Sequence, residues 1–144
     1  MSHMETEHFF SSPIKKAFSG IRQYNHYPDY LPGVIKTEVL PPVRKGSRCQ
    51  VRYELNLVKT FYYVLDMFED EPERIWWELA DSNIMKTNSG EWQLKADGKN
   101  KTKAFYSLDL RFRGLVPGAL VSKIAEANTT AMMTGFQKLI DEQG

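Results

Sequence analysis

The sequence predicts an α+β domain in which a curved, seven-stranded antiparallel sheet wraps around one long C-terminal helix. Two observations support this fold class. Apolar and polar residues alternate with a period of two through much of residues 34–112, which is typical of half-buried antiparallel strands. After Gly114 the period changes, and apolar residues recur at helical spacing over residues 117–141. A single helix that follows so much sheet must bury its apolar face against that sheet. We therefore look for function in the space between them.

The N-terminal segment predicts one strand and two short helices. Residues 6–10 suit an opening strand. Ser12 is predicted to be the N-cap of a helix over residues 13–23, because a proline follows it and apolar residues then recur at helical spacing. A second, shorter helical piece is expected over residues 25–30, and a proline-glycine pair after it favours a turn.

Six further strands are predicted, and their short connections favour an antiparallel order. They are expected at residues 34–40, 49–57, 61–68 and 75–79, around residues 92–94, and at residues 104–112. In the strand at residues 61–68, Tyr62, Val64 and Phe68 make the second face apolar too, so we expect it to be partly covered on both sides.

Composition bounds the possible functions. The 144 residues fit a single domain over residues 1–144, of which residues 1–4 are expected to be a cloning remnant or a disordered start. A net charge of +1 gives no reason to expect DNA binding. The single Cys49 cannot form an internal disulfide, which favours a reducing, cytoplasmic setting. No apolar run approaches the roughly 18 residues of a membrane span. We expect a monomer or weak association.

No residue pattern predicts a metal site, a cofactor or a catalytic centre. The three histidines have no metal-ligand spacing, and neither a nucleophile elbow nor a glycine-rich phosphate loop is present. Cys49 begins a strand and is expected to be a small buried hydrophobic residue. Four carboxylates that alternate with apolar neighbours are predicted to face solvent: Glu54, Asp66, Glu78 and Asp109.

Two residues interrupt the apolar stripe of the terminal helix. On a helical wheel, Asn128 and Gly135 fall near the middle of the stripe formed by Leu120, Val121, Ile124, Ala131 and Leu139. A buried amide costs free energy unless it is hydrogen-bonded, and a helical glycine costs about 1 kcal/mol relative to alanine. Either this face borders a cavity, or Asn128 bonds to the sheet backbone and Gly135 admits a bulky neighbour.

Three segments and the order of the elements carry a family resemblance. The segments are Tyr27-Pro28-Asp29-Tyr30-Leu31-Pro32-Gly33-Val34, Ser89-Gly90-Glu91-Trp92-Gln93-Leu94 and Leu115-Val116-Pro117-Gly118. The chain resembles the polyketide cyclase/dehydrase-like branch of the START-related SRPBCC superfamily, which includes coenzyme-Q-binding proteins and the bacterial ribosome-association toxin. The resemblance implies the helix-grip fold of START-like and Bet v 1-like proteins, with a deep and largely apolar cavity. It implies no shared catalytic motif.

The cavity implied by the resemblance supplies a set of candidate ligand-binding residues. Large side chains on the strand faces assigned inward suit a flat, apolar ligand with a few oxygens, and Asn128 would orient one of these oxygens. The candidates are Tyr30, Leu31, Tyr53, Leu55, Tyr63, Trp77, Trp92, Tyr106, Leu108, Ile124, Asn128 and Ala131. Ordinary core packing is the alternative explanation for the aromatic side chains.

Three functions remain open at this point. The first is binding or transport of a hydrophobic small molecule, such as a lipid, a quinone or a polyketide-like compound. The second is a polyketide aromatase/cyclase or dehydratase, which needs mainly positioning and one acid or base. The third is a ribosome- or partner-binding module, or a contact with a membrane surface. Its candidate residues are the basic ones at two hairpins: Lys95, Lys99, Lys101 and Lys103, and Arg44, Lys45 and Arg48.

Overall fold

A seven-stranded antiparallel sheet forms the frame of the protein in a computed structural model, which describes residues 2–56, 59–127 and 130–144. The strands follow the order β1-β7-β6-β5-β4-β3-β2 across the sheet. Their bounds are β1 (Ser2–Phe10), β2 (Val34–Leu40), β3 (Cys49–Asn56), β4 (Thr60–Asp70), β5 (Arg74–Ser82), β6 (Met85–Ala96) and β7 (Thr102–Phe112). The predicted fold class is confirmed.

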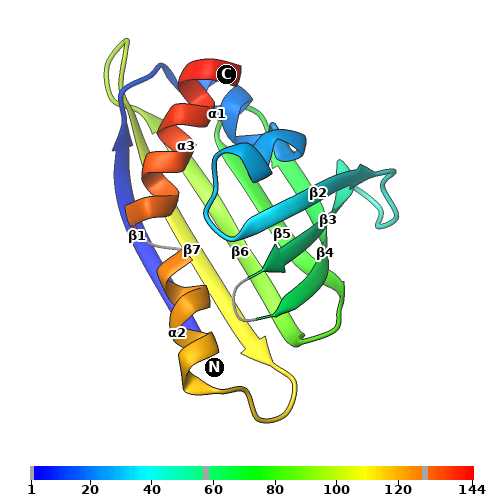
Figure 1. Cartoon of the computed structure of the whole chain (residues 1–144). Coiled ribbons are helices and arrows are strands. Elements are labelled where there is room, and N and C mark those ends of the chain that lie inside the picture. The colour runs from blue at the N-terminus through cyan, green and yellow to red at the C-terminus, as the bar shows by residue number, and fades with distance from the viewer. Residues whose placement is uncertain (1, 57–58, 128–129) are drawn as a thin grey trace.

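The helices cover one face of this sheet. They are α1 (Ile14–Ile21), the 3₁₀ helix η1 (Tyr24–Asp29), α2 (Gly118–Ala127) and α3 (Thr130–Gln143). Figure 1 shows α2 and α3 following one another across the face of the sheet, with α1 beside the C-terminal end of α3. The predicted C-terminal helix is confirmed over residues 118–127 and 130–143, and residues 128–129 lie outside the described residues.

Two strands begin well before their predicted first residues. β1 begins at Ser2, and its whole length pairs with β7, from Ser2 opposite Leu110 to Phe10 opposite Thr102. β6 begins at Met85, seven residues before Trp92. Polar and small residues occupy the first half of β6, so its alternation was hidden in the sequence.

Ser12 does not cap the first helix. Pro13 occupies the N-cap position, without a side-chain hydrogen bond. The Ser12 carbonyl instead accepts a hydrogen bond of 2.7 Å from Thr102 Oγ1, and its hydroxyl contacts Gln137 Nε2 at 3.3 Å. Ser12 therefore fastens the chain before α1 to both β7 and α3.

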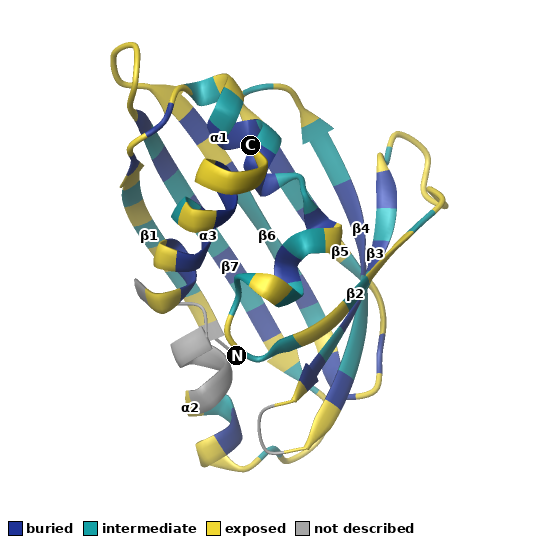
Figure 2. Cartoon of the chain, turned by 45° about the horizontal axis from the view of Figure 1, so that its top comes forward, coloured by how far each residue is buried: buried dark blue, intermediate teal, exposed yellow. Residues whose placement is uncertain are grey.

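The core lies between the helices and the concave face of the sheet, where buried residues alternate along each central strand (Figure 2). Cys49 is buried there, as predicted. On the opposite face, Asp66 is only 2% exposed and accepts a hydrogen bond of 2.9 Å from Gln50 Nε2. The prediction that Asp66 faces solvent is thus wrong, because the convex face of β4 is itself covered: Phe68 stacks on Trp76 at 5.4 Å.

The other three carboxylates of that prediction are more accessible and form ion pairs on the outer surface. Glu54 pairs with Arg52 at 2.6 Å, and Glu78 pairs with Arg44. Asp109 contacts His3 Nδ1 at 2.6 Å. None of the three lines the interior.

Candidate functional site

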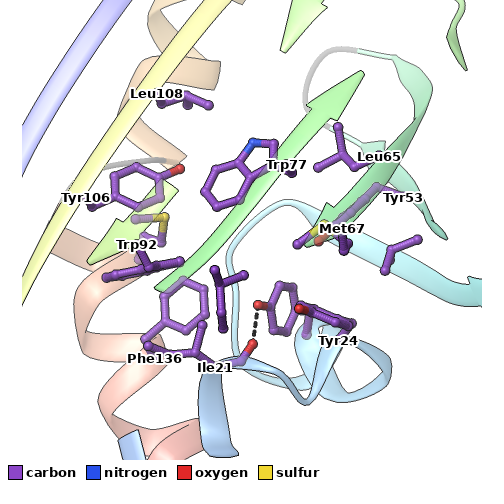
Figure 3. Close-up of a cluster of buried hydrophobic side chains, with 14 of the residues drawn as sticks. Ile21, Tyr24, Tyr53, Leu65, Met67, Trp77, Trp92, Tyr106, Leu108 and Phe136 are labelled. Carbon is purple, nitrogen blue, oxygen red and sulfur yellow. Dashed lines mark hydrogen bonds between the residues drawn. The ribbon is translucent and has the colours of Figure 1, made fainter. Parts of the chain in front are cut away.

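The concave face of the sheet, the segment after η1 and the helix α3 together line a cavity of about 100 Å³. Strands β3 to β7 supply most of its wall because every second residue of each strand points inward. From the helical side, Met132 and Phe136 of α3 add to the wall. Figure 3 shows Trp77, Tyr106 and Phe136 arranged around the same interior space.

Most of the predicted ligand-binding residues line this cavity. They are Leu31, Tyr53, Leu55, Tyr63, Trp77, Trp92, Tyr106 and Leu108. The placement agrees with the prediction, and a role in ligand binding stays a prediction for each of them.

Two predicted residues do not line the cavity. The Tyr30 hydroxyl donates a hydrogen bond of 3.1 Å to Glu142 Oε1, so this side chain fastens the η1 segment to α3. Ala131 is exposed. The predicted stripe omitted four buried residues of α3, so it was centred too close to Ala131. The buried side of α3 is set by Met132, Met133, Phe136, Leu139 and Ile140. Asn128 and the side chain of Ile124 lie outside the described residues.

Asn88 on β6 is the polar wall residue that sequence reasoning missed. Its side chain is 4% exposed, and its Oδ1 accepts a hydrogen bond of 3.0 Å from Trp77 Nε1. Its Nδ2 lies 3.6 Å from Met85 Sδ, which is a weak acceptor. The spacing in the sequence could have indicated this position. Asn88 lies two residues before Gly90 and four residues before Trp92, so all three are on the same face of the strand.

Gly90 explains how Trp77 reaches Asn88. A Cβ atom at position 90 would lie 2.6 Å from Trp77 Cζ2 and 2.4 Å from the Ser107 carbonyl oxygen. Only glycine therefore leaves room for the Trp77 indole to lie across β6. The short segment from Asn88 to Gly90 thus fixes both the position of the indole and the acceptor for its N–H.

Tyrosines supply the remaining polar atoms of the wall. The Tyr53 and Tyr63 rings stack with their centroids 4.8 Å apart and their planes 15° from parallel. Burial raises the pKa of Tyr53, Tyr63 and Tyr106 above the ordinary value. Their hydroxyls are therefore neutral at physiological pH. No Asp, Glu, His, Lys or Arg of the described chain lines the cavity, so its wall carries no formal charge.

A polar cluster lies next to the cavity, and Tyr27 of η1 belongs to both. The Tyr27 hydroxyl donates a hydrogen bond of 2.5 Å to the Ile21 carbonyl oxygen, and its ring packs edge-on against Phe136 at 5.4 Å (Figure 3). Beside it, Glu69 accepts a hydrogen bond of 2.7 Å from the Tyr24 hydroxyl. Arg22 Nη2 lies 2.9 Å from Glu69 Oε1, and the Glu69 side chain is only 7% exposed. This cluster was not predicted, although Glu69 continues the inward series of β4.

Gly135 settles one of the alternatives left open by the sequence. A Cβ atom there would lie 2.3 Å from the Tyr30 carbonyl oxygen and 3.2 Å from Leu31 Cδ2. The absence of a side chain at Gly135 therefore allows the segment after η1 to approach α3 closely, and it does not leave an empty space.

The basic residues at the last hairpin are partly neutralised by neighbours. Lys101 Nζ lies 3.8 Å from Asp97 Oδ2, and Lys103 Nζ lies 3.5 Å from Glu7 Oε1. A ribosome or membrane contact through this surface stays a prediction. Within the described ranges, no cluster of three or more His, Cys, Asp or Glu could hold a metal ion. None of the described helices is both long and apolar enough to cross a membrane.

The model of one protein family matches residues 11–137, described as polyketide cyclase/dehydrase and lipid transport. The chain belongs to this polyketide cyclase/dehydrase family. No curated protein matches the sequence.

Solved structures show the same fold at low sequence identity. A START superfamily protein from Mycobacterium smegmatis is 14% identical, with a TM-score of 0.81 and 99% of each chain covered. The Zhui aromatase/cyclase from Streptomyces sp. R1128 is 15% identical, with a TM-score of 0.82, and 97% of this chain aligns with 93% of that one. The di-domain ARO/CYC BexL from the BE-7585A biosynthetic pathway is 14% identical, with a TM-score of 0.65, and 99% of this chain aligns with 50% of it. At such identities the likeness of this polyketide cyclase/dehydrase family member to them is one of fold.

Proposed function

We propose that this protein binds or transports a hydrophobic small molecule, with a ring system and a few oxygens, in the cavity between the sheet and α3. The ligand would be a lipid, a quinone or a polyketide-like compound. The observation that carries the proposal is the wall itself: it is largely apolar and aromatic, it is free of formal charge among the described residues, and it holds a buried amide at Asn88. The lone Cys49 is in keeping with the reducing cytoplasm in which we place this function.

The wall matches such a ligand in chemistry. Removing about 200 Å² of apolar ligand surface from water contributes about 5 kcal/mol, which offsets much of the cost of association. Polar ligand atoms would meet neutral partners. The Asn88 amide has a donor held only by a sulfur contact, and the Tyr53 and Tyr63 hydroxyls belong to the stacked ring pair on the sheet. A charged ligand group would have no counter-ion in this wall and would be excluded by its desolvation cost.

The size of the cavity favours a compact ligand. At about 100 Å³ it is smaller than the roughly 300 to 1,000 Å³ of sites for drug-sized ligands. Met67, Met85 and Met132 line it, and methionine side chains repack more readily than branched ones. A two-ring compound therefore fits with small rearrangements, whereas a long acyl chain requires larger ones.

Calorimetric titration with menadione, an anthraquinone and palmitate tests this function. We expect the neutral ring compounds to bind and palmitate to bind more weakly, because its carboxylate has no partner in the wall. Native mass spectrometry of the purified protein would show a co-purified ligand of the same class. If none of the three compounds binds and no ligand co-purifies, the binding function is wrong.

A polyketide cyclase or dehydratase is the second candidate. It is supported by membership of the family and by the cavity tyrosines, which are the titratable groups of the described wall. Because burial raises the pKa of Tyr53, Tyr63 and Tyr106, these hydroxyls hold their protons and suit the role of acid better than that of base.

A linear poly-β-ketone thioester is the substrate for the corresponding test. Turnover that is lost in Tyr53→Phe, Tyr63→Phe or Tyr106→Phe, with binding retained, would establish an enzyme. Binding of ring compounds without turnover of the thioester would support the carrier function alone.

A further inference from the structure

Exposed apolar side chains are concentrated at one edge of the sheet, on β2 and the loop after it. β2 is last in the strand order, so its outer backbone edge has no strand partner in the described chain. Ile35 is 50% exposed, Val39 47% and Val43 74%. Phe9 and Leu115 are the other exposed large apolar residues in the described ranges, and they lie on other elements. Exposed stretches along β2 are visible in Figure 2. An apolar edge of this kind is a template for pairing with another strand.

The sequence of β2 is complementary to itself. It reads Val34-Ile35-Lys36-Thr37-Glu38-Val39-Leu40, with opposite charges on either side of Thr37 and two aliphatic residues beyond each charge. If a second β2 pairs antiparallel with Thr37 opposite its own copy, each Lys36 faces a Glu38, and each Ile35 faces a Val39. Opposite charges and β-branched pairs across strands each contribute about 0.2–1 kcal/mol. The chemistry of this edge therefore fits a second copy of the chain.

The two charges are available for such a contact. On the neighbouring strand β3, the residues opposite them are Glu54 and Arg52, which pair with each other at 2.6 Å. No ion pair joins Lys36 or Glu38 to another residue of the described parts of the chain, and both side chains are exposed.

We propose that the protein self-associates through β2, and that two copies of this strand pair about a two-fold axis at Thr37 to continue the sheet across the dimer. Such an interface is isologous and closed, so it gives dimers and not fibres. A single seven-residue edge buries less than the roughly 1,200 Å² of a stable complex, so the dimer is weak. Charges and bulges on edge strands also serve to prevent pairing, and Ile35 lies at a register irregularity. The charges of β2 could therefore either promote or prevent pairing, and a charge-swap experiment gives opposite results for these two roles.

Sedimentation velocity over a concentration range from about 10 µM to about 1 mM measures the association, because weak complexes dissociate within that range. The wild-type chain is expected to shift from monomer to dimer. Lys36→Glu alone and Glu38→Lys alone place like charges opposite each other, and each is expected to remain monomeric. A mixture of the two variants restores both charge pairs in a heterodimer, and the double variant K36E/E38K restores them in a homodimer.

Lys86→Glu is the matched control, because it reverses an exposed charge on β6, away from this edge, and should leave dimerisation unchanged. Circular dichroism of each variant as a monomer confirms that it is folded. Three results would overturn the proposal: a wild-type monomer at every concentration, a dimer that both single variants retain, or single variants whose mixture and double variant stay monomeric.

Discussion

Replacing Asn88 by leucine tests the polar pair at the centre of the cavity wall. Trp77 Nε1 donates to Asn88 Oδ1 at 3.0 Å, and Trp77 is only 7% exposed. Asn88→Leu keeps a side chain of similar length but leaves a buried N–H without its acceptor. Leaving such a group unpaired costs about 1–3 kcal/mol. We therefore expect the free energy of unfolding to fall by about this amount.

A double-mutant cycle separates the hydrogen bond from the other effects of the substitution. In a Trp77→Phe background no indole N–H is present, so adding Asn88→Leu should cost little or even stabilise the protein. The free energies of all four proteins come from urea denaturation followed by far-UV circular dichroism. Asn56→Leu, at the exposed end of β3, controls for the change of side chain. A coupling energy within about 0.5 kcal/mol of zero would refute the assignment of this pair.

Three further changes have defined outcomes. Gly135→Ala should lower the thermal midpoint, because the added Cβ would lie 2.3 Å from the Tyr30 carbonyl oxygen. Overpacking of this kind costs about 1–3 kcal/mol, whereas the gain in helix propensity is about 1 kcal/mol. A higher midpoint would contradict the close approach of Tyr30 to Gly135. Burial raises the pKa of the Cys49 thiol from 9.0 to about 11, so the stability that the neutral thiol contributes is complete below pH 9.0 and is lost as the pH rises through about 11. Alkaline unfolding of the wild type should then be steeper than that of Cys49→Ala, and parallel curves would disprove the link. Glu69→Gln breaks the 2.9 Å ion pair with Arg22 and should cost about 1–3 kcal/mol in urea denaturation at low salt, whereas an unchanged midpoint would show that the pair contributes nothing.

The strand faces were predictable because a period of two specifies which side chains point inward. Tyr53, Leu55, Trp77 and Leu108 were assigned to the interior on that basis alone, and all four line the cavity. Asn88 broke the same pattern by its polarity, and was missed for that reason. Its spacing from Trp92 indicated the inward face, but the reason for a polar residue there is its hydrogen bond to Trp77 on another strand, which the sequence does not show.

The helical side of the cavity was less predictable. The wheel drawn through residues 117–141 centred the apolar stripe near Ala131, which is exposed. The buried side of α3 instead carries Met132, Met133, Phe136 and Ile140. Gly135 looked like an opening in the wall, but the glycine admits the backbone of Tyr30 instead. Such close approaches depend on elements distant in sequence, and periodicity carries no information about them.

Filling the cavity is the most direct test of the binding function. Leu108 is 3% exposed and lines the cavity, whereas Leu115 is fully exposed in the loop before α2. Leu108→Phe and Leu115→Phe therefore add the same bulk inside and outside the site. In calorimetric titration with menadione, we expect Leu115→Phe to bind as the wild type does and Leu108→Phe to lose at least tenfold in affinity, about 1.4 kcal/mol. Equal binding by all three proteins would contradict the claim that the ligand occupies this cavity.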